Sequence, residues 1–562
     1  MHHHLTLRAK VIIMISVMAS LFLVALDQTI IATALGRIVE EFNAFESLSW
    51  IVTAYLLTTT ITVPIAGKMS DLFGRRVILL LGVAIFGIGS LFSGMAGTVD
   101  QLVVWRAFQG IGGGIITANA FTIIADLFAA RERGRWQGMI GAVFGLSSVI
   151  GPLLGGWLTD GQAVFGLVTD WRWTFWINVP VAIAAFAIIA IFCPPLKHDK
   201  KPVVDYIGAA LLTVALGTLV LAVDNTENIF ADLLNATGWS LELLRTVMFS
   251  IVAVAVGSFI WVERRAKEPI LPLRFFRNRN YVLIMGVATF FGAAFLGAIL
   301  YLTQFNQQVF GVSPTESGLM LLPMIGGLML TSIVSGQIIS RTGRYKVFMQ
   351  IGVVVATVMI GLLATLTPES PYVYEAVLMA FLGAGLGVVM PVMNLAVQNE
   401  FQQHEMGVAT SSNQLFRSLG STIGIAVFGA MLTAGLVSNL SGVQDEPYLQ
   451  TLRQNSQASQ FGDFTDSNTL LNLNMPDTKA RITEGFNDSV MQLPPAPRRD
   501  AVERFDQQQS QYADTITYAF SDSLRRIFIT SSVLMLVAAI LVFMIRERPL
   551  KEASPEQAPG VA

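Results

Sequence analysis

The stretch GKMSDLFGRR, residues 67–76, has a second copy later in the chain, GQIISRTGRY, residues 336–345. The copies share two glycines and one arginine at equal spacing: Gly67, Gly74 and Arg75 in the first, Gly336, Gly343 and Arg344 in the second. Each copy stands between two long apolar segments. Internal repeats with one topology recur in polytopic membrane folds, so this pair predicts a chain made of two related halves.

The composition indicates a membrane protein with many spans. Of the 562 residues, 53% are hydrophobic and 13% are charged, whereas a soluble domain is about one quarter charged. The net charge of −2 gives no reason to expect a nucleic-acid partner. The single cysteine, Cys193, excludes an intramolecular disulfide. The opening MHHH, native or a tag remnant, is set aside, and no cleavable signal peptide is predicted.

Fourteen apolar segments reach the roughly 20 residues that a membrane helix needs. They cover approximately 11–36, 48–69, 77–97, 101–126, 137–159, 173–193, 205–223, 245–263, 281–306, 316–340, 346–367, 373–398, 406–437 and 522–545. The repeat leaves the seventh and eighth outside the two halves. We therefore expect an all-α polytopic fold with a six-helix half in 1–200, two inserted helices in 201–265 and a second six-helix half in 266–562.

Basic residues gather in alternate short loops, for example Lys68, Arg75 and Arg76 after the second segment, while the other loops carry mainly acids. By the positive-inside rule, both termini are expected in the cytoplasm. A bacterial inner membrane is the expected location, as a separate hypothesis that this rule does not supply. The large polar loop at about 438–521 then lies outside, and its low hydrophobicity predicts a weakly packed or disordered segment. Residues 500–523 lack Pro and Gly and either extend the last helix or form a linker.

An aspartate stands in the middle of the first apolar segment, SLFLVALDQTIIATAL, residues 20–35. Such an acid costs about 2.5–3.5 kcal/mol at the membrane centre. Burial raises the pKa of a carboxyl and a nearby Arg lowers it, so Asp27 is a candidate proton carrier, with Arg106 and Arg417 as the charges that tune or compete for it. Alternatively, Asp27 belongs to a permanent ion pair, or Arg106 reaches the outer surface because it is near a helix start.

The first copy of the repeat has the residues of a charged gate at the cytoplasmic turn. Its glycines permit a tight turn, Asp71 suits a helix N-terminus, and the arginines suit paired carboxylates. Asp126, at the cytoplasmic end of the fourth helix, is the expected partner. The gate set is Gly67, Asp71, Gly74, Arg75, Arg76 and Asp126. The alternative is a plain positive-inside anchor.

The fifth helix carries GAVFGLSSVIGPLLGG, residues 141–156, in which small residues allow close helix packing and Pro152 permits a bend. Gly151, Pro152, Gly155 and Gly156 therefore mark a helix that rocks against its neighbour or a static packing seam.

The glycines of GIGGG, residues 110–114, follow no strand, so helix packing explains them. No GxxxxGK[ST] motif occurs, and ATP drive is unsupported.

The substrate path is expected to be apolar and aromatic with few polar groups, which suits lipophilic ligands. Its candidate lining residues are Trp50, Tyr55, Asn119, Phe144, Tyr301, Gln304, Asn394 and Asn413. No catalytic residues, metal ligands or cofactors are predicted, and the chain is not expected to be an enzyme.

Five stretches together resemble the major facilitator superfamily, in the same order: LDQTIIATAL, GKMSDLFGRR, VVWRAFQGIGGG, GPLLGG and WRWTFWINVP (171–180). With fourteen helices, the chain is similar to the drug:proton antiporter branch. The resemblance implies that the cytoplasmic motif is a conformational gate and that GPLLGG marks antiporters. Ser340 stands where the first repeat copy has Asp71, so the charge network of the gate is expected to be asymmetric.

The expected function is proton-coupled export of lipophilic or amphiphilic compounds, including drugs, by a monomer whose partners are protons, small molecules or lipids, and the membrane. Export of a lipid or lipid-linked molecule is an alternative, motivated by the long outer segment. Nutrient symport and a non-transporting sensor are the remaining alternatives. They differ from an antiporter in the direction and the presence of flux.

Overall fold

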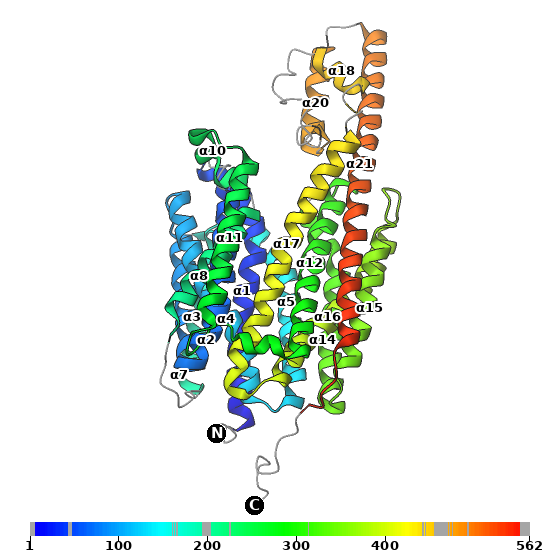
Figure 1. Ribbon diagram of the computed structural model, residues 1–562. Coiled ribbons are helices and arrows are strands. Elements are labelled where there is room, and N and C mark those ends of the chain that lie inside the picture. The colour runs from blue at the N-terminus through cyan, green and yellow to red at the C-terminus, as the bar shows by residue number, and fades with distance from the viewer. Residues whose placement is uncertain are drawn as a thin grey trace, which may run out of the picture.

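The computed structural model describes residues 6–42, 48–159, 161, 163–164, 167–193, 204–223, 226–312, 314–440, 443, 446–454, 470, 473–474, 476–491 and 494–550. Its long helices run side by side, and the start of the first helix and the end of the last helix lie at the same end of the bundle (Figure 1). We call this end the terminal face and the other end the opposite face. Within these described residues, fourteen helices are long and apolar enough to cross a membrane, which agrees with the predicted number.

The elements of the first part of the chain are α1 (Leu7–Phe42), α2 (Leu48–Phe73), α3 (Arg75–Gly94), α4 (Val99–Leu127), α5 (Ala130–Thr159), the strands β1 (Ala163–Val164) and β2 (Leu167–Val168), α6 (Trp173–Trp176) and α7 (Asn178–Phe192). The strands pair antiparallel, with Ala163 opposite Val168. The sixth span is broken between α6 and α7. Pro180 lies in the first turn of α7, where its missing N–H leaves no hydrogen bond unmade.

The middle of the chain forms α8 (Tyr206–Val223), α9 (Thr226–Ile229), α10 (Ala231–Thr237) and α11 (Leu241–Glu263). The remaining elements are η2 (Leu273–Arg277), α12 (Arg279–Gln308), α13 (Pro314–Met320), α14 (Leu322–Thr342), α15 (Lys346–Leu363), α16 (Tyr372–Glu400), η3 (Gln403–Glu405), α17 (Met406–Leu440), α18 (Pro447–Gln454), α20 (Pro476–Ser489) and α21 (Pro495–Met544).

The long helices pack in two groups. In the first, α4 packs on α2 and α3, and α1 packs on α5 and α7. In the second, α12 packs on α17 and α21, and α16 packs on α14 and α15. The pair α8 and α11 pack on each other, and α8 also contacts α2. Each large group has its own apolar core.

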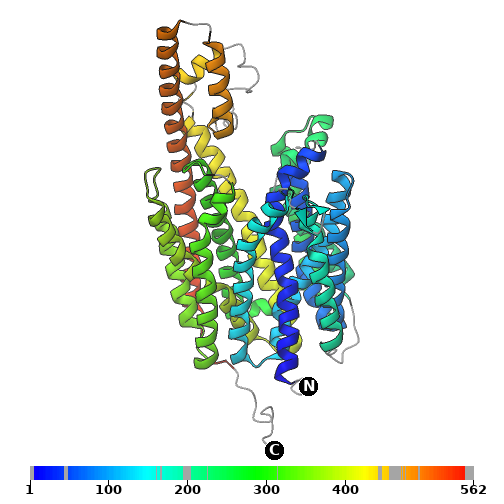
Figure 2. The same cartoon turned by 180° about the vertical axis from the view of Figure 1, so that it is seen from behind.

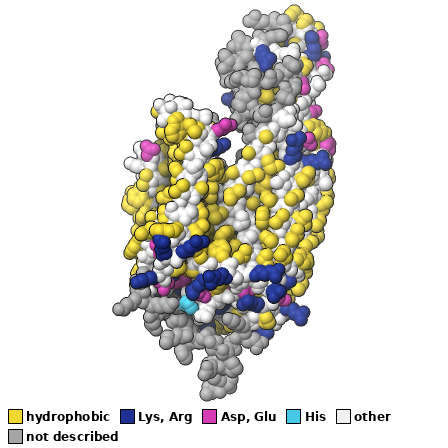
Figure 3. Space-filling model, in the orientation of Figure 1, with side chains coloured by type: hydrophobic (Ala, Val, Ile, Leu, Met, Phe, Trp, Pro, Cys, Tyr) yellow, Lys and Arg dark blue, Asp and Glu magenta, His cyan; other side chains and the backbone are white. Residues whose placement is uncertain are grey.

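The two groups meet closely toward the terminal face, where α5 crosses α14 and α2 crosses α17. At the first crossing, a Cβ added to Gly138 would stand 2.2 Å from the carbonyl oxygen of Ser332. Only glycine permits this approach of the two backbones. The groups diverge toward the opposite face (Figures 1 and 2), and the space-filling view shows a notch between them there (Figure 3). The structure is therefore closed at the terminal face.

The polar segment before the last span is partly helical. Helices α18 and α20 lie beside the first part of α21 (Figure 1), and we call these three pieces the protruding cluster. Phe486 stacks on Phe505 at 4.0 Å between ring centroids, and Tyr448 packs on Phe505 and Tyr512. The expectation of weak packing across 438–521 is wrong for these residues, because a few aromatic side chains at helical spacing build a small core. Residues 455–469, within the same loop, lie outside the described part. Residues 500–523 extend the last helix.

Candidate functional site

Asp27 is fully buried and accepts hydrogen bonds from three side chains. Arg106 Nη1 donates to Oδ2 at 2.5 Å, Gln109 Nε2 donates to Oδ1 at 2.9 Å, and Asn178 Nδ2 donates to Oδ1 at 3.2 Å. The donors come from α4 and from the first residue of α7. In this conformation Asp27 is therefore a paired carboxylate that is sealed from solvent.

The Arg106 guanidinium is enclosed on all sides. Its Nη1 also donates to Gln109 Oε1 at 2.9 Å, and its Cζ lies 4.3 Å from the centroid of the Tyr55 ring. Only 1% of its surface is exposed, so the alternative in which Arg106 reaches the outer surface is wrong. The sequence did not indicate that Gln109 and Asn178 would also donate to Asp27; Asn178 is the first residue of α7.

The side chain of Arg417 lies outside the network around Asp27. Its Nη2 donates to Gln414 Oε1 at 2.5 Å, and it makes no ion pair with a described residue. The structure brings Asp27 and Arg106 together but does not bring Arg417 into their network.

A second ion cluster lies at the terminal face. Arg75 Nε donates to Asp126 Oδ2 at 2.8 Å, and the same guanidinium pairs with Asp71. The Asp71 carboxylate also accepts the backbone N–H groups of Gly407 and Val408, at 3.2 and 3.1 Å. These N–H groups belong to the first turn of α17, so Asp71 joins α2 to a helix N-terminus in the other group.

The other glycines and arginines of the two repeat copies make different contacts. Gly74 adopts a φ of 97° at the turn between α2 and α3, which explains the glycine. Gly67 packs on Ser411 of α17. Arg76 donates to the Ala190 carbonyl oxygen and does not contact the acids of the cluster. In the second repeat copy, Gly343 ends α14 at a φ of 71°, and Arg344 is exposed without an ion pair to a described residue. The ionic contacts of the two copies are therefore asymmetric.

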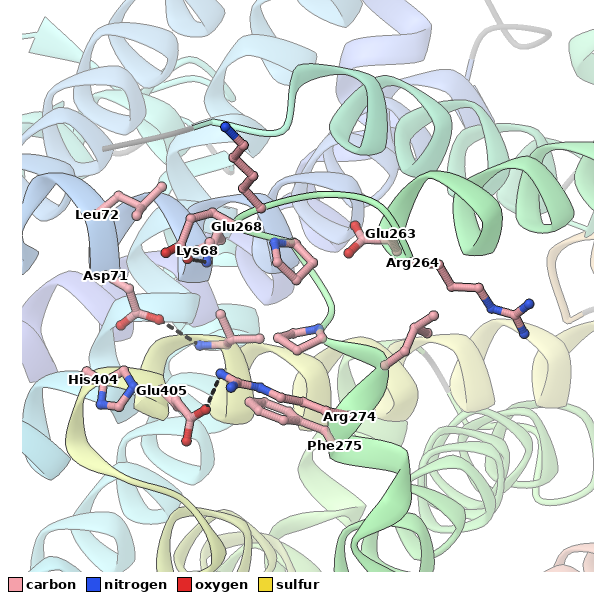
Figure 4. Close-up of a pocket in the computed structure, with 15 residues that line it drawn as sticks. Lys68, Asp71, Leu72, Glu263, Arg264, Glu268, Arg274, Phe275, His404 and Glu405 are labelled. Atoms are coloured by element: carbon pink, nitrogen blue, oxygen red, sulfur yellow. Dashed lines mark hydrogen bonds and ion pairs between the residues drawn. The ribbon is translucent and has the colours of Figure 1, made fainter. Parts of the chain in front are cut away.

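A pocket of about 460 Å³ adjoins the Asp71 cluster (Figure 4). The segment that follows α11 crosses here between the two groups of helices. Glu268 pairs with Lys68 of α2 at 2.8 Å, and Arg274 pairs with Glu405 at 2.6 Å. Sequence reasoning did not find these bridges, because charges in a long loop do not indicate which helix they reach.

The fifth-helix motif packs on α1. A Cβ on Gly151 would meet Thr29 Oγ1 at 2.0 Å, and that hydroxyl donates to the Ser147 carbonyl oxygen at 3.0 Å. Gly155 is buried, whereas a Cβ on Gly156 would meet nothing within 4 Å. The side chain of Pro152 lies outside the described part.

The candidate lining residues fall into two sets. Trp50, Phe144 and Gln304 are half-buried. Five are buried: Tyr55, Asn119, Tyr301, Asn394 and Asn413. Tyr55 packs under Arg106, the ring of Tyr301 packs on Phe428, and Asn413 Nδ2 donates to Asn394 Oδ1 at 2.7 Å. The asparagine pair joins α17 to α16.

Sequence reasoning missed a buried acid, Glu375, near the opposite-face end of α16. Its side chain is fully buried, Asn306 is its polar neighbour, and neither carboxyl oxygen has a well-formed hydrogen bond to a described residue. The basic residues of the helices that pack on α16 lie at the terminal-face ends of those helices or, for Arg417, about one third of the way along α17 from that face. A lone Glu in the first turn of a helix gives no sequence signal of burial.

At the opposite face, Arg172 of the WRWTFWINVP stretch donates to Glu41 Oε1 at 2.7 Å. This hydrogen bond lowers the pKa of the Glu41 carboxyl. A lowered folded-state pKa stabilises the fold above the ordinary carboxyl range, and the contribution is lost as the pH falls. Because Glu41 is largely exposed, the effect is small.

Comparisons with known proteins agree with this architecture. Residues 17–425 match the Major Facilitator Superfamily. The multidrug transporter protein MdtP of Bacillus subtilis is 34% identical over 553 residues, which cover 97% of this chain and 95% of MdtP. Multidrug resistance protein 3 of the same organism is 35% identical over 431 residues, 76% of this chain and 81% of that protein.

Solved structures show the same fold at low sequence identity. The human organic anion transporter MFSD10 has a TM-score of 0.59 and 15% identity, with 94% of this chain and 99% of that chain covered. The proton:xylose symporter XylE has a TM-score of 0.55 and 17% identity, with 75% and 88% covered. The candidate spans in the described residues, the family match and the relatives named as transporters together define a multi-pass membrane transporter. The chain belongs to the Major Facilitator Superfamily.

Proposed function

We propose that this transporter exports lipophilic or amphiphilic compounds in exchange for protons, with its terminal face in the cytoplasm of a bacterial cell. Two relatives that are at least 34% identical over most of their length are named for multidrug transport or resistance. The gathering of Lys and Arg toward the terminal face (Figure 3) supports the orientation. The moving bodies are the halves 1–200 and 266–562, with 201–265 inserted between them.

The observation that carries the coupling proposal is the sealed Asp27–Arg106 pair. In the conformation closed at the terminal face, Arg106, Gln109 and Asn178 stabilise the charged carboxylate. A rearrangement that withdraws Arg106 would leave a buried acid without its cation, which favours uptake of a proton. Return to the paired state would release that proton. Asp27 then carries the proton and Arg106 controls its release.

The cluster of Arg75, Asp71 and Asp126 is the gate of this proposal. It ties α2 to the N-terminus of α17, so opening at the terminal face must break the two hydrogen bonds to Asp71. The closed state is therefore favoured until substrate or proton binding offsets these contacts.

Purified protein in liposomes with an imposed pH gradient tests this function. Wild type is expected to carry a lipophilic dye against its gradient while protons move in the opposite direction. Asp27→Asn is expected to abolish proton flux and uphill transport. Asp170→Asn removes a more exposed ion pair with Arg172 and is the matched control. Undiminished uphill transport by Asp27→Asn would show that the pair is purely structural, and co-directional fluxes would indicate a symporter.

Lipid export is a second candidate function. It is favoured by the protruding cluster, in which α21 continues beyond the length needed to span the membrane. Deletion of 440–515 separates the two. Drug efflux should survive the deletion in either case, whereas export of a fluorescent lipid should be lost if lipid is the cargo.

A further inference from the structure

Arg417 is a membrane-embedded cation with no carboxylate partner in the described part of the chain. It lies about one third of the way along α17 from the terminal face, is half-buried, and donates to the neutral Gln414. Charged side chains at this depth face protein or water and pair with one another or with backbone groups. An arginine that is left with only an amide therefore requires another explanation.

The acids with buried side chains are engaged elsewhere. Their side chains contact Arg106 in the case of Asp27, Arg75 in the cases of Asp71 and Asp126, the N–H groups of Ile270 and Leu271 in the case of Glu263, Asn306 in the case of Glu375, and Arg548 in the case of Glu400. None of these contacts involves Arg417. In this conformation the protein does not neutralise the charge of Arg417 with an acid of its own described residues.

The guanidinium lies on the inward side of α17. Ile423, 44% exposed, marks the outward side of the helix. Gln414 stands nine positions earlier, which is half a turn away at about 100° per residue, and it is buried. Because Arg417 Nη2 bonds to Gln414, its charged end lies toward the interior between the two groups of helices.

The same face of α17 leads down to the closed seam. Thr410, seven residues before Arg417 and therefore two turns nearer the terminal face, accepts a hydrogen bond from Gln398. Gln398 also accepts one from Gln137 of α5 at 2.9 Å. Arg417 therefore lies further from the terminal face than this contact between the two halves. The two groups of helices diverge in that direction (Figures 1 and 2).

Polar atoms beside Arg417 also lack partners. Gln414 Nε2 and Asn413 Oδ1 are buried without a hydrogen bond to a described residue. A guanidinium presents several N–H groups in a fork that matches an oxyanion, and the Gln414 amide adds a further donor. The cluster offers mainly donors and a positive charge, which is the complement of an anionic head group.

We propose that Arg417 and Gln414 form the subsite that binds the anionic head of an amphiphilic substrate, a carboxylate or sulfonate, while its apolar body lies between the two halves. This inference rests on the proposed export function and names its substrate class. The substrate supplies the counter-charge that the protein lacks. Charge-assisted hydrogen bonds in a poorly hydrated site are the strong ones, so this contact selects anionic over neutral compounds of the same shape.

The test uses two fluorescent probes that differ only in one group, a carboxylate and its primary amide, in liposomes of zwitterionic lipid with an imposed pH gradient. The measured quantity is the ratio of kcat/KM for the carboxylate to that for the amide. Wild type is expected to prefer the carboxylate, and Arg417→Gln is expected to lower the ratio by about tenfold or more. Arg417→Lys should keep part of the preference. Arg526→Gln, on an exposed face of α21, is the control and should leave the ratio unchanged.

The outcomes separate the proposals. Transport of the amide probe by Arg417→Gln shows that the variant is folded and coupled. An unchanged ratio, or equal slowing of both probes, overturns the anion subsite and leaves the export function standing. If wild type drives neither probe, the export function fails as well. If anionic phospholipid added to the liposomes abolishes the preference of wild type, the site holds a resident lipid head group and the substrate assignment is wrong.

Discussion

Replacing Asp71 by Asn should weaken closure at the terminal face. The carboxylate accepts the N–H groups of Gly407 and Val408 and pairs with Arg75. A negative charge at a partly buried helix N-terminus is worth up to about 2 kcal/mol, and a hydrogen bond to a charged group contributes about 1.5–3 kcal/mol. Asn keeps one acceptor oxygen, so we expect the closed state to be destabilised by about 2–4 kcal/mol relative to the open state.

This loss changes the ratio of closed to open protein by about 30-fold to 1,000-fold, since each 1.4 kcal/mol is tenfold. Cys193 is the single cysteine and is buried, so replacing it by Ser gives a clean background. Spin labels at Glu132→Cys on α5 and Thr342→Cys on α14, both exposed at the terminal face, report the distance between the halves. Double electron–electron resonance should show a longer component in Asp71→Asn that is absent from the parent.

Asp170→Asn, at the opposite face, is the matched control and should leave this distance distribution as in the parent. If Asp71→Asn also leaves it unchanged, the contacts to α17 do not decide closure, and the charged turn is only an anchor.

Three further experiments test the helix packing, the buried acid and the protruding cluster. Gly383→Ala places a Cβ 1.8 Å from the Met324 carbonyl oxygen and should lower the stability in detergent by about 1–3 kcal/mol. In the control Gly257→Ala the new Cβ meets nothing within 4 Å, so this variant should gain about 0.5–1 kcal/mol. Equal effects of the two substitutions on stability would refute the close approach at Gly383. Glu375→Gln retains the shape without a charge that the structure leaves unpaired, so the unfolding temperature should stay constant or rise, and a clear fall would reveal a partner. Phe505→Ala removes the stacked ring of the protruding cluster and should cost that cluster about 3–5 kcal/mol, seen as faster proteolysis there with the membrane helices intact; unchanged proteolysis would show that the ring is not part of a core.

The fourteen spans were predictable because membrane helices are read from apolar length alone. Two partners of the charged turn were also predictable, namely Asp126 for Arg75 and a helix N-terminus for Asp71. Few groups can satisfy a charge at a buried turn. The sequence did not indicate that this N-terminus belongs to α17, because contacts between distant segments leave no local pattern.

The site was harder to predict where chain geometry decides the contacts. Asn178 donates to Asp27 from α7, a helix 151 residues further along the chain, and no local sequence pattern reveals such a contact. Arg417 was a candidate charge to tune Asp27, but its side chain contacts Gln414 instead, and a position in the sequence does not reveal which distant helix a side chain faces. The protruding cluster was misjudged for a different reason. Average hydrophobicity was low over the loop, yet Tyr448, Phe486 and Phe505 suffice for a small local core.

Helix α21 is continuous over 50 residues, about 75 Å at 1.5 Å per residue, and only about 30 Å of that length is needed to cross the hydrocarbon layer. The remaining length of the helix projects beyond the hydrocarbon layer as a rigid rod. If the second half tilts by about 10° during the transport cycle, the far tip of a 75 Å rod sweeps about 13 Å. A motion that is barely visible at the closed seam would thus be amplified into a large displacement above the membrane.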